Sequence, residues 1–254
     1  MKRALSDFTK ASREDLAIGL YSSILQITRK LAKADKRTIA LYLQQHPVRK
    51  LQIGCGSHIL HGWLNSDISP RPHHVVRLDI TKRFPFQNDT FDYIFSEHSI
   101  EHVSYAKGQV MLEECFRVLR DGGKIRLSTP DLSFLVSLYR SIKSDIQERY
   151  IRWSTERFIA NAPYCDDTFV INMFVRNWGH RFIYDEKVLR DSLDRVGFRG
   201  ILRCGLNESE DGGLRDLENV ARLPDGFLGL ESVILEGTKN PVSGRNPDPT
   251  TSER

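Results

Sequence analysis

The sequence predicts an α/β protein with a mainly parallel sheet and helices on both faces. Short apolar segments end on glycine or a polar residue, segments of helical period lie between several of them, and glycines stand where the chain must turn. Such alternation is typical of parallel sheets, which bind ligands at the carboxyl ends of their strands. The expected strands are residues 49–53, 63–67, 75–79, 91–96, 124–128, 200–204 and 230–236.

Two helices have clear boundaries in the sequence. Residues 109–120 present an apolar face, and Asp121-Gly122-Gly123 supplies the glycine expected at a helix C-terminus. Asp185 can cap a second helix that Gly197 closes. Residues 131–178 are helical in pattern and rich in aromatic side chains, without strands between them, so we expect an inserted cap.

Charge and composition divide the chain into three parts. Residues 1–48 form a basic N-terminal helical extension, residues 49–238 the main domain with its cap, and residues 239–254 a polar, Pro-rich tail expected to be disordered. The basic extension is compatible with peripheral contact to an anionic membrane or to nucleic acid, but a solvated helix face is the favoured interpretation. Nothing in the sequence indicates the oligomeric state.

Bulk properties point to a cytoplasmic protein. The 40% hydrophobic and 28% charged content is ordinary for a globular chain, and no apolar run approaches the roughly 20 residues that a membrane span needs. The N-terminus is too polar for a secretory signal. Four cysteines stand far apart without a C-x-x-C pair, which predicts reduced thiols and neither a disulfide framework nor structural zinc.

The ends of the first strands carry residues suited to a nucleoside cofactor. Gly54 and Gly56 let the backbone approach a ligand, and Asp67 can accept hydrogen bonds from ribose hydroxyls. Asp79 can accept one from an exocyclic amine. In a dinucleotide-binding turn Ile59 would be a third glycine, which argues against an NAD(P)-dependent oxidoreductase.

These segments resemble the class I S-adenosylmethionine-dependent methyltransferases, in particular the group around the type 11 enzymes. The matching stretches are LQIGCGS, LNSDI, RLDITKRFPFQNDTFDYIFSEHSIEHV, EECFRVLRDGGKIRLSTPDL and, more loosely, HRFIYDEKVLRDSLDRVGF. The resemblance implies a Rossmann-like, seven-stranded sheet and a transferase that uses S-adenosylmethionine. It implies cofactor contacts from Gly54, Cys55, Gly56, Ser57, Asp67, Asp79, Ile80, Ser96 and Glu97.

The sequence departs from the family pattern in two places. Gln52 replaces an acidic residue common in the first strand, which would weaken a contact to the amino group of the cofactor. The link between Gly54 and Gly62 is shorter than a parallel crossover normally needs, so its helix must be vestigial.

His98-Ser99-Ile100-Glu101-His102 has the H-x-x-E-H spacing of a zinc peptidase, in which two histidines share one face of a helix. A zinc site would need a third ligand, and none stands near in the sequence. The motif also directly follows the fourth expected strand, where the family lines its cofactor. We therefore expect no metal.

The acceptor is expected to be a small molecule, methylated at oxygen, that enters between the strand ends and the aromatic cap. Methyl transfer to a hydroxyl requires alignment and removal of one proton, a task that suits a neutral histidine. His98 and His180 are the candidate bases, with Glu101 a weaker one. Because methyl transfer has no obligatory catalytic group, a non-catalytic S-adenosylmethionine-binding scaffold stays open as an alternative.

Overall fold

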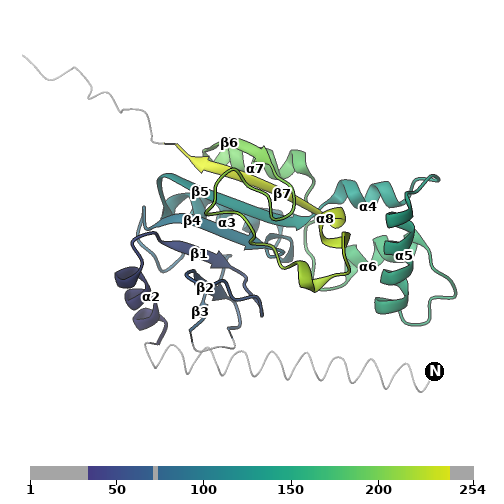
Figure 1. Ribbon diagram of the computed structural model, residues 1–254, viewed down its shortest axis with the longest axis horizontal. Helices are drawn as coiled ribbons and strands as arrows, with labels where there is room; N and C mark the ends of the chain where they lie inside the picture. Colours follow the sequence, from purple (N-terminus) through teal and green to yellow (C-terminus); the bar gives the residue numbers. More distant parts are fainter. Residues whose placement is uncertain (1–33, 71–73, 241–254) are drawn as a thin grey trace, which may run out of the picture.

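A seven-stranded sheet of order β3-β2-β1-β4-β5-β7-β6 forms the body of the protein (Figure 1). The computed structural model describes residues 34–70 and 74–240. The strands are β1 (Lys50–Ile53), β2 (Leu64–Asp67), β3 (Val76–Arg77), β4 (Phe91–Glu97), β5 (Leu119–Pro130), β6 (Phe198–Arg203) and β7 (Ser232–Lys239). Strands β1 to β5 pair in parallel, whereas β7 runs antiparallel to both β5 and β6. The predicted Rossmann-like, mainly parallel sheet is confirmed.

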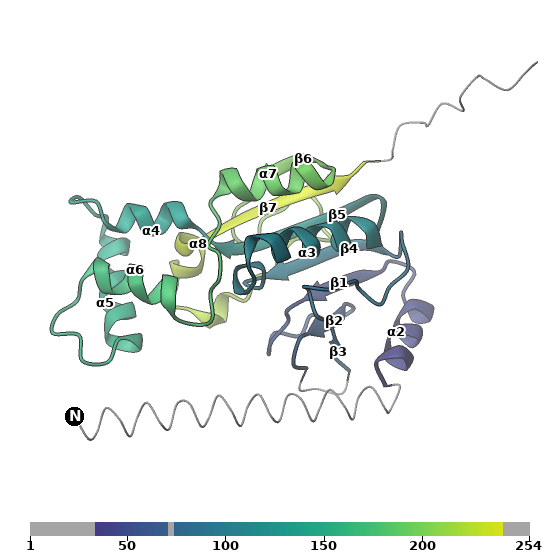
Figure 2. The same ribbon diagram turned by 180° about the vertical axis from the view of Figure 1, so that it is seen from behind.

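Helices cover the two faces of the sheet unequally. They are α2 (Ala34–Gln45), η1 (Ile100–His102), α3 (Tyr105–Val118), α4 (Leu132–Leu138), α5 (Asp145–Phe158), α6 (Asp167–Arg176), α7 (Glu186–Val196), η2 (Val220–Arg222) and α8 (Phe227–Glu231). Figure 2 shows α3 and α7 side by side on one face, with α4, α5 and α6 grouped beyond one end of the sheet. Coil carries much of the packing on the other face, where Leu214 and Leu217 bury against Trp63 and Phe95.

Successive residues of β4 pack into the two hydrophobic clusters that lie on opposite faces of the sheet. Ile94 is fully buried in the larger cluster with Met111 and Leu112 of α3, while the neighbouring Phe95 is fully buried in the cluster on the opposite face. Successive side chains of a strand point to opposite faces, so a central strand needs apolar residues in sequence. Burying each of these side chains stabilises the fold by about 1.5–3 kcal/mol.

The register brings the ends of several strands to one level. Ile53 of β1 lies opposite Ser66 of β2 and Ser96 of β4, and Glu97 lies opposite Ser128 of β5. The residues that follow these strands therefore gather at one edge of the sheet, as the sequence predicted.

The first crossover contains turns and no helix over residues 54–63, which confirms the vestigial link. Backbone groups that lack helical partners must find others. The Gln52 side chain supplies them: its Nε2 donates to the His58 carbonyl at 3.0 Å, and its Oε1 accepts from the Leu60 amide at 3.3 Å. Gln52 thus holds the short link in place.

Helix α3 ends earlier than expected, and the predicted glycine cap at Asp121-Gly122-Gly123 is wrong. The Val118 turn is followed by Leu119 in an extended conformation, paired with Phe91 of β4, so residues 119–130 form one long strand. Pairing with a distant strand overrides the local helix-ending pattern. The other helix boundary is confirmed: Asp185 accepts a hydrogen bond from the Val188 amide, and Gly197 closes α7 with φ of 119°.

Two expected segments lie outside the described residues. Most of the N-terminal extension precedes residue 34, and α2 is the part of it that the structure contains. Nearly all of the expected tail, from residue 241 onward, is likewise not described.

A buried ion-pair network joins β5, β7 and the coil over the second face. The fully buried Arg126 donates to Glu218 and Glu236, each at 2.6 Å, and to the carbonyls of Gly205 and Glu208. Burial by itself would lower the pKa of Arg126, but the two carboxylates raise it above its usual value. The guanidinium therefore stays charged inside the protein.

We expect Arg126→Met to lower the free energy of unfolding by about 3–5 kcal/mol, because it leaves two buried carboxylates without their cation. Urea denaturation monitored by circular dichroism measures the change. Arg195→Met is the matched control, since Arg195 pairs with Asp191 on the exposed surface of α7 and should matter little. Equal effects of the two substitutions would contradict the structural role of the network.

Candidate functional site

A glycine turn follows β1 and lies against the residues that follow β4. Gly54 and Gly56 have φ of 69° and 53°, in the left-handed region that glycine tolerates best. A Cβ built at Gly54 would lie 1.8 Å from the Ser99 hydroxyl oxygen, whereas one at Gly56 would meet nothing within 4 Å. The first glycine thus permits close approach of two strand ends, and the second faces open space.

Asp67, at the end of β2, holds this turn. Its Oδ2 accepts a hydrogen bond from the Gly56 amide at 3.0 Å, and its Oδ1 accepts one from the Ser69 amide at 2.9 Å. Each carboxylate oxygen has a further lone pair for a ligand hydroxyl.

Asp79 lies beyond the end of β3 in a tight turn. It accepts hydrogen bonds from the Thr81 amide and hydroxyl at 3.0 and 2.7 Å, and Lys82 Nζ lies 3.0 Å from its Oδ2. Burial raises the pKa of Asp79, but these Thr81 and Lys82 contacts outweigh it and lower the pKa below its ordinary value. The side chain is a carboxylate at neutral pH.

These residues enclose a first cavity of about 430 Å³. Its lining combines two carboxylates with apolar side chains and a glycine that leaves room for a ligand, a composition that fits the sugar, base and methionine portions of S-adenosylmethionine. The lining residues are Gly54, Gly56, Asp67, Ile68, Leu78, Asp79, Ile80, Thr81, His98, Ser99, His102 and Val103.

Four residues expected at the cofactor do not line this cavity. Cys55 is buried, and burial raises the pKa of its thiol to about 12, while Ser57 is exposed. Ser96 is buried within β4, and the Glu97 carboxylate accepts hydrogen bonds from the Asn219 amide. Conversely, the sequence analysis missed Ser99 and His102 as lining residues, although both belong to the H-x-x-E-H segment.

A second cavity of about 320 Å³ lies between the strand ends and the aromatic helices. One wall holds Glu101, Glu231 and Arg222, and the cavity shares His98 and His102 with the first. The other wall is aromatic, formed by Tyr150, Trp153, Phe158, Phe174 and Trp178. The two cavities are therefore neighbours with a common histidine boundary.

The H-x-x-E-H segment does not form the helix on which two histidines four residues apart would share a face. His98 has φ of 46° and precedes the short 3-10 helix η1, so His98 and His102 do not share a helical face. His98 Nε2 is 3.1 Å from the Ser232 hydroxyl of β7, and its Nδ1 is 3.4 Å from Glu101 Oε1. The helical pairing that a zinc peptidase would need is absent from this segment.

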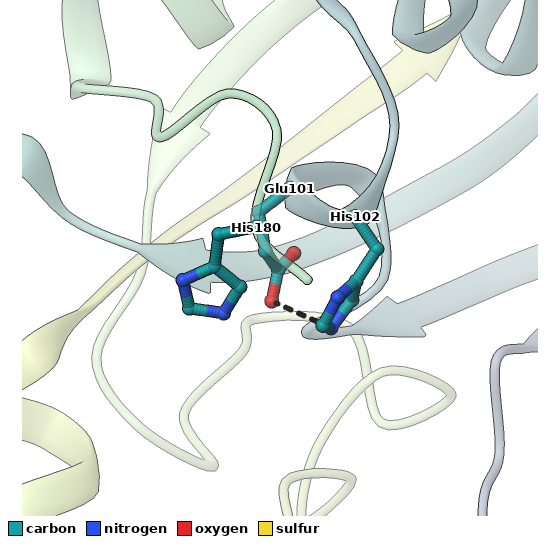
Figure 3. Close-up of side chains that lie close together, drawn as sticks. All are labelled: Glu101, His102 and His180. Carbon is teal, nitrogen blue, oxygen red and sulfur yellow. Dashed lines mark ion pairs between the residues drawn. The ribbon is translucent and has the colours of Figure 1, made fainter. Parts of the chain in front are cut away.

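His180 is brought to this segment by backbone hydrogen bonds. The amides of Arg181 and Phe182 both donate to the Glu101 carbonyl, at 2.7 and 3.2 Å. As a result the side chains of Glu101, His102 and His180 converge, as Figure 3 shows, with ligating atoms within 4.8 Å of one another. His180, distant from the motif in the sequence, thus lies beside Glu101 and His102 in space.

Burial governs the protonation of this group. It raises the pKa of Glu101 to about 8 and that of Glu231 to about 7, and it lowers the pKa of His98 well below the usual value. Burial also lowers the pKa of His102 and His180. The contact of Glu101 with His98 is thus mainly between neutral groups at pH 7.

We expect the free energy of unfolding to fall as pH rises from 6.5 to 8.5. In this window the folded protein still holds part of the carboxyl protons of Glu101, with a pKa of about 8, and of Glu231, with a pKa of about 7, whereas the unfolded chain holds almost none. Each whole proton that unfolding releases lowers the free energy of unfolding by about 1.4 kcal/mol per pH unit. Histidines contribute little above pH 6.5, because the unfolded chain then also holds them mainly neutral.

Denaturation at several pH values measures the slope, which Glu101→Gln should flatten. Glu186→Gln is the control, because hydrogen bonds from Arg190 and Arg203 lower the pKa of Glu186 and leave it ionised throughout the window. An unchanged slope in Glu101→Gln would contradict a protonated Glu101.

Comparison with known proteins supports the cofactor interpretation. Residues 51–127 match the family model of a methyltransferase domain. This segment contains β1 to β4, the glycine turn, both acids of the first cavity and most of β5. No curated protein matches the chain.

Solved structures of similar fold include an S-adenosylmethionine-dependent methyltransferase from Archaeoglobus fulgidus, with 18% identity, a TM-score of 0.43, and coverage of 83% of this chain and 94% of that one. A possible histamine N-methyltransferase from Thermotoga maritima has 16% identity, a TM-score of 0.43, and coverage of 87% and 98%. A putative methyltransferase in complex with the Haloferax volcanii Trm112 activator has 14% identity, a TM-score of 0.43, and coverage of 84% and 93%. Likenesses this distant say nothing of the acceptor.

The chain's own residues supply the remaining argument. The glycine turn against Ser99 and the carboxylates of the first cavity lie in the matched segment. These features agree with the family match, and residues 51–127 are similar to a methyltransferase domain.

Proposed function

We propose that the protein transfers the methyl group of S-adenosylmethionine to a hydroxyl oxygen of a small acceptor bound in the second cavity. One observation carries the proposal: the first cavity, which fits the cofactor, shares His98 and His102 with an aromatic-lined cavity next to it. Holding two reactants in adjoining sites supplies the alignment on which methyl transfer depends.

On the cofactor side, Asp67 would hold the ribose hydroxyls and Asp79 the adenine amine, with Gly54 and Gly56 beside the methionine portion. Bound S-adenosylmethionine supplies a methyl group already activated by its sulfonium. Ile68 and Ile80 line the same cavity and offer apolar contacts to the base. Cys55, Ser57, Ser96 and Glu97 would act at most through the backbone that they position.

On the acceptor side, the aromatic wall favours a substrate with an apolar or aromatic body. Trp178 contacts Phe158 and Phe174 with ring centroids 5.2 and 5.4 Å apart, so this wall is closely packed. An acceptor bound against these rings would shield its reacting oxygen from water. The polar lining residues Glu101 and Glu231 would then receive the hydroxyl end of the acceptor.

His98 and His180 are the proposed acceptors of the hydroxyl proton. His98 lines both cavities, and His180 lines the second with its Nδ1 engaged by the Phe174 carbonyl at 2.7 Å. That bond directs the Nδ1 proton to the carbonyl and leaves Nε2 with a lone pair.

We also propose that the protein is cytoplasmic. All four cysteines are free, which suits a reducing compartment. In the part of the chain that the structure describes, no helix is long and apolar enough to cross a membrane.

Asp67→Ala should weaken the binding of S-adenosylmethionine by about 1–3 kcal/mol, because the ribose hydroxyls and the Gly56 amide lose a charged acceptor. Isothermal titration calorimetry measures the affinity. Asp194→Ala, which removes an exposed carboxylate of α7, should bind normally. Tight binding of NADH without binding of S-adenosylmethionine would overturn the assignment of the cofactor.

Turnover is tested with radiolabelled S-adenosylmethionine and a panel of hydroxylated aromatic compounds, with matched amines as competitors. Once an acceptor is found, His98→Ala and His180→Ala should be compared in single-turnover transfer. Loss of the base should slow transfer by about 10²- to 10⁴-fold. Cofactor affinity should be retained in His180→Ala, because His180 does not line the first cavity. If both variants keep the full rate from pH 6 to 9, neither histidine is the base; methylation of amines alone would contradict the oxygen acceptor.

A further inference from the structure

Three side chains with metal-ligating atoms meet at the boundary of the second cavity. Glu101, His102 and His180 each offer one ligand atom, and these atoms lie within 4.8 Å of one another (Figure 3). Two imidazoles and one carboxylate form a donor set that divalent transition metals such as zinc or iron prefer. All three residues line the second cavity.

In two of the three side chains the other polar atom already has a partner. Glu101 Oε2 accepts from the Thr129 hydroxyl at 3.1 Å, and His180 Nδ1 donates to the Phe174 carbonyl at 2.7 Å. Burial lowers the pKa of His102, and the backbone of Trp178 and Gly179 partly offsets this by raising it. Such outer hydrogen bonds orient the ligands of protein metal sites and select the nitrogen that coordinates.

The atom left over on Glu101 is an unusual one. The Glu101 side chain is 0% exposed, and its Oε1 has no hydrogen-bond partner among the described residues. His98 Nδ1 lies 3.4 Å and His102 Nε2 3.8 Å from this oxygen, and neither contact is a hydrogen bond. A buried polar atom without a partner is costly, and a cation between these groups would satisfy it.

Backbone contacts make the arrangement rigid. The amides of Arg181 and Phe182 donate to the Glu101 carbonyl, so the segment that carries His180 is tied to η1, which carries the other two side chains. The three groups therefore do not depend on flexible surface loops to meet.

We infer that Glu101, His102 and His180 form a binding site for one divalent transition-metal ion, with its remaining coordination positions open to the second cavity. Bonds of about 2.0–2.2 Å require the three ligand atoms to draw together on binding. Three protein ligands with an open position are typical of catalytic sites and not of structural ones.

The role of the ion, unlike its binding, rests on the proposed function. An acceptor hydroxyl coordinated at the open position would have a lowered pKa and release its proton to His98. The oxygen lone pair then forms the bond to the methyl carbon as the carbon–sulfur bond breaks, and S-adenosylhomocysteine leaves. In this arrangement His180 serves as a ligand and His98 as the proton acceptor.

The test measures metal binding by the untagged full chain after treatment with a chelator. Zn²⁺ titration by calorimetry should give one ion per chain, and Co²⁺ should produce visible absorption bands that Zn²⁺ abolishes. Glu101→Gln and His180→Ala should each weaken binding by more than the roughly 10- to 100-fold typical of losing an outer hydrogen-bond partner. His61→Ala, which removes an exposed histidine from the first crossover, should bind like the wild type.

Absence of Co²⁺ bands in the wild type, or equal affinity in all variants, would overturn the inference. Glu101→Gln preserves the shape of the side chain, so its circular dichroism and its thermal midpoint without metal separate lost binding from misfolding. Binding of S-adenosylhomocysteine to His180→Ala should be normal, because His180 does not line the first cavity. A chain that binds Zn²⁺ but no S-adenosylhomocysteine would refute the proposed function and leave the metal site standing.

Discussion

The close approach of Gly54 to Ser99 is the constraint on which both cavities depend. A side chain at residue 54 would overlap the Ser99 hydroxyl, and moving Ser99 would displace the neighbouring His98 and the η1 turn. The parallel register of β1 and β4 makes this contact unavoidable, because both strands end at the same level. One glycine therefore permits the first cavity and, through η1, shapes the second.

The last strand connects the chemistry to the rest of the fold. β7 places Ser232 beside His98, and the preceding Glu231 hydrogen-bonds Tyr150 of α5. The Glu231 carbonyl also accepts from the Asp131 amide, where β5 gives way to the helices. The aromatic wall and the histidine boundary thus share one support, and an antiparallel strand inserted between β5 and β6 is what brings it there.

Local patterns were reliable where a local cause acts. Asp185 and Gly197 bound α7 because a capping carboxylate and a left-handed glycine act within one turn of a helix. The boundary at Gly122 failed because Leu119 pairs with Phe91, a residue distant in the sequence. Gln52 likewise has a role that its own strand does not predict. Its side chain bonds backbone groups of the shortened crossover, which have no helical partners.

The sequence by itself determined the sheet, the glycine turn and the acids at the ends of β2 and β3. These features depend on strand periodicity and turn residues, which are properties of short stretches of consecutive residues. Only the tertiary structure decided what the H-x-x-E-H segment does. Its spacing suggested a helical pair of histidines, but the chain forms η1 instead and completes the group with His180 through hydrogen bonds to the Glu101 carbonyl. The end of β4 meets a segment that follows four further α-helices in the chain, and this meeting depends on long-range packing, which no local pattern encodes.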